Sequence, residues 1–202
     1  FYTLGTMLDV DVINRWASAF GLGVMSGIDL PYEVEGLVPS RAWKREQFSE
    51  PWYQGETISV AIGQGAVSVT PVSVAVMMAT VANGGRRVTP RLFKAVREDE
   101  GWREVEPPLV ASTPVMQPET IEAIRRGLWM AVNHEGTSGR ARIEGRDVIG
   151  KSGTAQVMSL SRRTAAKGSD VDVQDHGWFV FAAPRDKPQI AGVVFVEHSD
   201  HG

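Results

Sequence analysis

The residues of this chain with the clearest chemical potential stand together in one run, Gly150-Lys151-Ser152-Gly153-Thr154-Ala155-Gln156. Lysine supplies a fixed positive charge, hydroxyl groups can bind a carboxylate, and free backbone amides can stabilise a developing oxyanion. The small residues leave room for a peptide backbone to lie along the segment, as in strand addition. The run therefore predicts a surface that binds an extended ligand with a carboxylate.

The same segment also matches a phosphate-loop pattern, because residues 145–152 read Gly-x-x-x-x-Gly-Lys-Ser. A phosphate loop requires a strand before its first glycine and a helix that begins at the lysine, whose N-terminus binds phosphate. Here 139–144 is a weak strand candidate, and 153–157 is rich in glycine and β-forming residues. A nucleotide-binding domain is nevertheless an alternative, and it predicts a helix from Lys151.

We expect instead a single strand over 148–157. The two-residue period of a strand would then place Lys151 and Gly153 on one face and Ser152 and Thr154 on the other. For a lone Lys-Ser-Gly, an ordinary exposed edge strand would be by far the better explanation. The length of the run and the aromatic strand that follows it favour a binding edge.

The composition indicates a globular protein and excludes several classes. The chain has 202 residues, 43% of them hydrophobic, with a net charge of -3 and no cysteine. Interspersed charges argue against a nucleic-acid partner. Without cysteine there are no disulfides, thiolate catalysis or cysteine-based zinc sites. No run reaches the roughly 20 consecutive apolar residues of a membrane span. Because the chain starts at Phe1 without a Met, we expect an interior or processed segment.

The pattern of apolar residues and breakers predicts helices first and strands afterwards, which is typical of an α+β domain with an antiparallel sheet flanked by helices. A hydroxyl and a proline at Thr70-Pro71 mark the start of a central apolar helix that ends at Asn83. The expected elements are a helix over 1–20, an ordered irregular segment over 27–57, helices over 70–82 and 117–132, a hairpin over 88–105, and strands over 148–157, 177–183 and 190–197.

Two other groups of polar residues are weaker candidates for function. One has metal-ligand chemistry but lies at a strand exit and in a loop, where we expect a solvated polar end and no bound metal: Asp175, His176, His198, Asp200 and His201. The other is Gln64 between two glycines, which we expect to be structural, with tight backbone packing beside the central helix.

Taken together, the motifs of the chain resemble the transpeptidase domain of class B penicillin-binding proteins, in particular the branch that serves rod elongation. The resemblance extends over essentially the whole chain. The matching stretches are GKSGTAQ, HGWFVFAAP, IAGVVFVEH, GIDLPYEVEGLVPS, the Trp43-Lys44 pair, PWYQGETISVAIGQG and VTPVSVAVMMATVANGG.

The resemblance implies the penicillin-binding protein and serine β-lactamase-like fold, and cross-linking of peptidoglycan through a serine acyl-enzyme. By motif position, Lys151 is the electrostatic clamp and Ser152 hydrogen-bonds within the site. Gly153 leaves room for substrate, and Thr154 contacts the carboxylate and lends its amide to the oxyanion hole. The implied ligands are stem peptides that end in D-Ala-D-Ala and β-lactams, with a glycosyltransferase partner and no cofactor. The implied location is the bacterial inner membrane, with the catalytic domain in the periplasm.

The chain departs from the family pattern at the nucleophile. Neither Ser-x-x-Lys nor Ser-x-Asn or Ser-x-Asp occurs anywhere in the sequence. We therefore expect residues 1–202 to be the C-terminal portion of a single transpeptidase domain, incomplete at both ends and inactive alone. A non-catalytic binding module of the same fold is the remaining alternative.

Overall fold

The computed structural model describes residues 1–106, 116–156 and 174–199. The elements in chain order are α1 (Tyr2–Met7), α2 (Val10–Ala19), α3 (Arg41–Phe48), α4 (Gln54–Ala61), α5 (Pro71–Ala82), β1 (Ala95–Glu98), β2 (Gly101–Glu104), α6 (Pro118–Asn133), the 3₁₀ helix η1 (Gly139–Ala141), β3 (Ile149–Ala155), β4 (His176–Ala183) and β5 (Ile190–Val196). Helices together with antiparallel strands confirm the predicted α+β class.

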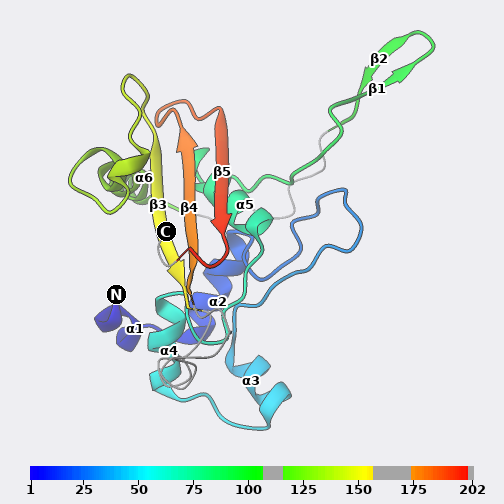
Figure 1. Cartoon of the computed structure of the whole chain (residues 1–202). Helices are drawn as coiled ribbons and strands as arrows, with labels where there is room; N and C mark the ends of the chain where they lie inside the picture. The colour runs from blue at the N-terminus through cyan, green and yellow to red at the C-terminus, as the bar shows by residue number, and fades with distance from the viewer. Residues whose placement is uncertain (107–115, 157–173, 200–202) are drawn as a thin grey trace.

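The centre of the molecule is a three-stranded antiparallel sheet in the order β3-β4-β5 (Figure 1). The strands are rich in β-branched and aromatic residues, which suit a pleated and partly buried surface. In the register of the sheet, Lys151 lies opposite Val180 and Gly153 lies opposite Trp178. Because β3 pairs only with β4 among the described residues, its other edge is open to further contacts.

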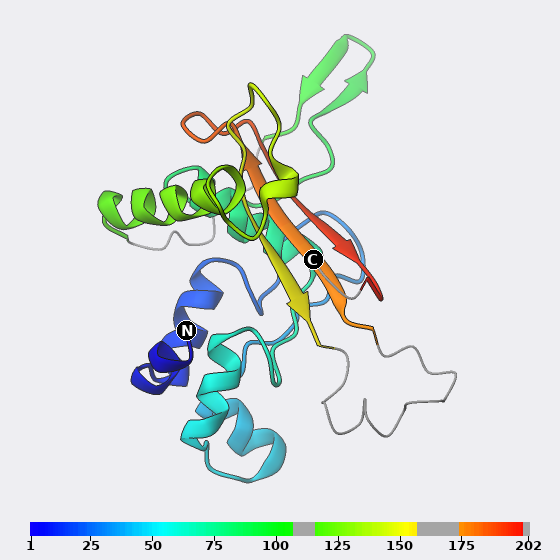
Figure 2. The same ribbon diagram turned by 60° about the vertical axis from the view of Figure 1, so that its left-hand side comes forward.

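Helices α5 and α6 cover one face of this sheet (Figure 2). The α5 helix begins as predicted, with Thr70 Oγ1 accepting a hydrogen bond of 3.2 Å from the Ser73 N–H. Its Met78 packs in the core against Ile149 of β3 and Ala182 of β4, all three almost completely buried. This packing fixes the face of β3 that looks toward the helices.

The N-terminal helix predicted over 1–20 is two helices. Asp9 interrupts it, because its carboxylate accepts a hydrogen bond of 2.8 Å from the Asp11 N–H and caps α2. The segment over 27–57, predicted as irregular, also contains α3 and the start of α4. Ser40 caps α3 by accepting a hydrogen bond from the Trp43 N–H. In both places a polar capping residue decides where a helix begins.

The hairpin predicted over 88–105 is confirmed, with pairing only from Ala95 to Glu104. It projects away from the body of the molecule in both views (Figures 1 and 2). The indole of Trp102 on β2 is 72% exposed. The hairpin therefore adds little to the core.

Candidate active site

The run with the predicted chemistry forms the edge strand β3. The strand spans Ile149–Ala155, so no helix begins at Lys151 and no helix N-terminus is available for phosphate. The phosphate-loop alternative is therefore wrong, because the backbone at Lys151 is extended, although the sequence of residues 145–152 matches the pattern. Residue 157, the end of the predicted strand, lies outside the described residues.

A cleft of about 570 Å³ opens along β3. Because Ile149 faces α5, the two-residue period puts Lys151 and Gly153 on the helix-covered face of the sheet. The cleft is lined by β3, by neighbouring aromatic and aliphatic side chains of the sheet, and by the loop that leads into α5 and the start of that helix. These lining residues are Lys151, Ser152, Gly153, Thr154, Ala155, His176, Trp178, Val180, Phe195, Ile62, Gly63, Val67, Ser68, Val69, Val74 and Met77.

The free edge of β3 turns backbone polar groups away from β4. The Ser152 N–H donates a hydrogen bond of 3.0 Å to Ser138 Oγ, which is not on the sheet. Since backbone groups alternate along a strand, the N–H and C=O of Thr154 point in the same outward direction. The Thr154 carbonyl accepts a hydrogen bond of 3.3 Å from Gln64 Nε2, in agreement with this direction. The outward amide of Thr154 thus lies where an oxyanion or a ligand backbone can reach it.

The ammonium of Lys151 is held at the same edge by two oxygen atoms. Its Nζ lies 2.9 Å from Thr137 Oγ1 and 2.7 Å from the Ser152 carbonyl oxygen. Ser152 Oγ is 3.5 Å from Nζ and 3.4 Å from Thr137 Oγ1. Lys151, Ser152 and Thr137 therefore form one polar cluster that combines a positive charge with two hydroxyl groups.

The α6 helix places this cluster. Asn133, at the end of α6, donates through Nδ2 to the carbonyl oxygens of Trp129 at 3.0 Å and Val148 at 2.8 Å, which ties the helix to the start of β3. The turn that follows carries Thr137 and Ser138, and the Ser138 N–H bonds back to the Ala131 carbonyl oxygen at 2.9 Å. Neither hydroxyl was predicted from the sequence. Two adjacent hydroxyl residues between glycines, after an amphipathic helix, are the signal that could have found them.

Gln64 contacts the binding strand through its hydrogen bond to the Thr154 carbonyl oxygen, and its expected structural role stays a prediction. The glycines beside it, Gly63 and Gly65, have φ values of 73° and 74°, in the left-handed region that favours glycine. A side chain at Gly63 would meet no atom within 4 Å, so tight packing is not the reason for that glycine. The two glycines instead allow the turn that carries Gln64 to β3.

An ion pair between a buried lysine and a partly exposed glutamate holds the helix that leads into Gln64. Lys44, only 6% exposed, places its Nζ 2.6 Å from both carboxylate oxygens of Glu56 and 4.4 Å from the centre of the Tyr53 ring. Burial raises the pKa of Glu56, but the hydrogen bonds from Lys44 and from the Tyr53 N–H outweigh burial and bring this pKa below its ordinary value. This pair joins α3 to the start of α4.

The histidine candidates lie beside the cleft. His176 Nδ1 accepts a hydrogen bond of 3.1 Å from the His198 N–H, and the two rings are 5.0 Å apart. Residues 1–106, 116–156 and 174–199 contain no cluster of three or more acidic or histidine residues that could hold a metal ion. Asp200 and His201 lie outside the described residues.

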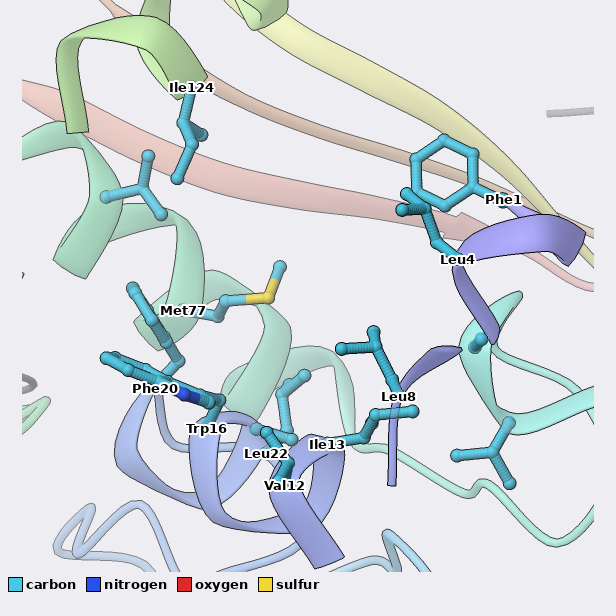
Figure 3. A pocket seen from close by; sticks show the side chains of 14 residues that line it. Phe1, Leu4, Leu8, Val12, Ile13, Trp16, Phe20, Leu22, Met77 and Ile124 are labelled. Carbon is cyan, nitrogen blue, oxygen red and sulfur yellow. The ribbon is translucent and has the colours of Figure 1, made fainter. Parts of the chain in front are cut away.

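A second hollow, of about 540 Å³, lies between α1, α2, α5 and α6 (Figure 3). All of its lining side chains are apolar, and only Met77 also lines the cleft at β3. It therefore offers no groups for acid, base or nucleophilic chemistry.

Comparison with known proteins points to one family. The model of the penicillin binding protein transpeptidase domain matches residues 1–202. The chain is 35% identical to the peptidoglycan D,D-transpeptidase MrdA of Haemophilus influenzae, covering 100% of the chain and 32% of that relative. It is 37% identical to the protein of the same name from Acinetobacter baumannii, covering 100% of the chain and 30% of that relative.

The solved structures give the same result. A crystal structure of Pseudomonas aeruginosa PBP2 in complex with WCK 5153 matches with a TM-score of 0.82 and 34% identity, over 100% of this chain and 42% of that one. Helicobacter pylori PBP2 in a complex with MreC also matches with a TM-score of 0.82, at 27% identity, over 100% of this chain and 34% of that one. The chain spans about a third of the length of the curated relatives it matches.

Proposed function

Because the chain belongs to the penicillin binding protein transpeptidase domain family, we propose that it is the C-terminal portion of a peptidoglycan D,D-transpeptidase domain that cross-links the cell wall during rod elongation. The observation that carries the proposal is the free edge of β3, where Lys151, the hydroxyls and the outward amide of Thr154 line one cleft. Such an edge suits a peptide that ends in a carboxylate.

The reaction is a serine-based acyl transfer, with the serine outside this chain because Ser-x-x-Lys does not occur in it. The serine oxygen bonds to the carbonyl carbon of the D-Ala-D-Ala peptide bond, the C–N bond breaks, and the departing amine of D-alanine takes up a proton. An amine of a second stem peptide then attacks the ester, and the serine recovers its proton. A β-lactam acylates the same serine by opening its ring.

The residues of this chain bind and polarise the donor peptide. Lys151 supplies positive potential for the ligand carboxylate, and Ser152 and Thr154 add hydroxyl donors. The outward Thr154 amide donates to the oxyanion that forms on the attacked carbonyl. Gly153 leaves space, and its position supports this role, since an added Cβ there would meet only Trp178 Cβ within the described part of the chain, at an ordinary 3.6 Å. Among the described residues no close contact requires a glycine at this position, which is consistent with space kept for a ligand.

The family also suggests the surroundings of the protein. We place the parent protein in the inner membrane with this domain in the periplasm, beside a glycosyltransferase. Support for a partner comes from similar chains in a peptidoglycan synthase complex and in a complex of PBP2 with MreC. Within the ranges that the structure describes, no helix is both long enough and apolar enough to span a membrane.

Labelling with a fluorescent penicillin tests the function. The full-length protein should become covalently labelled, and Lys151→Met should slow labelling about 100-fold, the usual effect of removing one preorganised electrostatic contact. The isolated 202-residue chain should not be labelled. A folded full-length protein that takes no label would contradict the proposal and favour a non-catalytic binding module.

A further inference from the structure

The hydroxyl of Thr137 lies between the two polar side chains of the predicted clamp. Thr137 Oγ1 is 2.9 Å from Lys151 Nζ and 3.4 Å from Ser152 Oγ. Thr137 is also exposed. A ligand that reaches Lys151 and Ser152 therefore also comes within reach of Thr137.

Counting hydrogens shows what this cluster can offer. An ammonium only donates, so Thr137 Oγ1 accepts from Lys151 and keeps its own hydrogen for another partner. One hydrogen bond between the two hydroxyls of Thr137 and Ser152 uses one of their two hydrogens, whichever group donates. The second hydrogen remains for a ligand. The third N–H of Lys151 is held only by a long contact of 3.5 Å to Ser152 Oγ and can turn to the same ligand.

Thr137 is not what holds its own turn in place. The neighbouring residue, Ser138, does this, since it is 5% exposed and bonds to the Ala131 carbonyl oxygen and to the Ser152 N–H. The side chain of Thr137 makes its hydrogen bonds only to Lys151 and Ser152 among the described residues. Its hydroxyl therefore serves the cluster and not the turn.

We propose that Thr137 is a further ligand-binding residue of this site. It directs the ammonium of Lys151 and, paired with Ser152, donates an O–H to the carboxylate of the ligand. The proposal rests on the proposed transpeptidase function, because it requires a ligand whose carboxylate lies beside β3. The protein would then bind that carboxylate with one hydroxyl from the turn after α6 as well as with groups of the strand.

Acylation rates of the full-length protein test this role. Thr137→Val removes the hydroxyl and keeps the shape, Thr137→Ser keeps the hydroxyl, and Thr120→Val on exposed α6 surface is a matched control. With a penicillin we expect Thr137→Val to be about 10-fold slower, the usual value of a hydrogen bond to a charged group. With the methyl ester of the same penicillin, which has no carboxylate, the acylation rate of Thr137→Val should differ from that of wild type by less than about 2-fold. Thr137→Ser and Thr120→Val should stay near wild type.

Each other outcome overturns a different statement. If the wild-type protein is labelled and Thr137→Val is acylated at the same rate, the role of Thr137 is overturned and the proposed function is not. An equal loss with the acid and the ester would show a structural role and would also overturn it. No labelling of the folded wild-type protein would overturn the proposed function and, with it, this inference.

Discussion

Replacing two glycines of β3 with alanine should have opposite effects: Gly150→Ala should lower stability, and Gly153→Ala should lower the acylation rate. At Gly150 an added Cβ would lie 2.6 Å from the Val180 carbonyl oxygen and 2.7 Å from the Phe179 ring. At Gly153 the added Cβ would point into the cleft, where Trp178 Cβ, at 3.6 Å, is its only near neighbour among the described residues. The first methyl group therefore collides with the fold, and the second occupies space that a ligand needs.

The structure gives the size of each effect. Ordinary contacts begin near 3.4 Å, so at Gly150 the neighbours must move by about 0.8 Å, and one of them is a backbone oxygen that cannot rotate away. Overpacking of this kind costs about 1–3 kcal/mol, and we expect about 2 kcal/mol for Gly150→Ala. Gly153→Ala should leave the free energy of unfolding unchanged within about 0.5 kcal/mol, or raise it slightly because alanine lowers the conformational entropy of the unfolded chain. It should nevertheless slow acylation by about 10-fold or more, because the methyl group takes up space beside the reacting carbonyl.

The assay measures both properties for both variants of the full-length protein. Urea unfolding followed by tryptophan fluorescence gives the free energy, and labelling with a fluorescent penicillin gives the acylation rate. A fully stable Gly150→Ala variant would refute the packing argument. A Gly153→Ala variant that is acylated at the wild-type rate would refute the claim that this glycine makes room for a ligand.

The remaining predictions concern the ion pair of Lys44 and Glu56. Glu56→Gln leaves the buried ammonium with Glu50, 3.8 Å away, as its only carboxylate partner among the described residues. It should lower the free energy of unfolding by about 2–3 kcal/mol in urea titrations, less than for a fully buried pair because the Glu56 side chain is 39% exposed. An unchanged value would mean that the pair is not formed. Because the folded pKa of Glu56 lies below its ordinary value of 4.5, its contribution is complete above that pH and is lost as the pH falls through the folded pKa. The stability difference between wild type and Glu56→Gln should therefore shrink below about pH 4.5, and a difference that grows there would have the wrong sign.

Much of the fold could be predicted because the local signals agree with the tertiary structure. The strands and α5 have apolar patterns, a cap and breakers that all point to the same elements. The two short helices in the segment over 27–57 were missed because α3 is polar, with only Lys44 buried, and lies between prolines. Its one local signal was Ser40, which has the side chain of a good helix cap.

The candidate site could be predicted only in part, for a different reason. The residues of the binding strand are consecutive in sequence, so their combined chemistry could be recognised from one run. Thr137, Ser138 and Gln64 reach that strand from two separate loops. The flanking glycines mark both loops as turns, but the contact with β3 depends on the packing of α6 and on the turn at Gly63 and Gly65.

A crystal structure of the full-length protein acylated by a penicillin would show whether β3 binds the ligand. We expect the ligand carboxylate to lie within hydrogen-bonding distance of the hydroxyls beside Lys151, and the acyl oxygen to accept from the Thr154 N–H at the free edge of β3. A ligand whose carboxylate and acyl oxygen bind away from β3 would contradict this expectation.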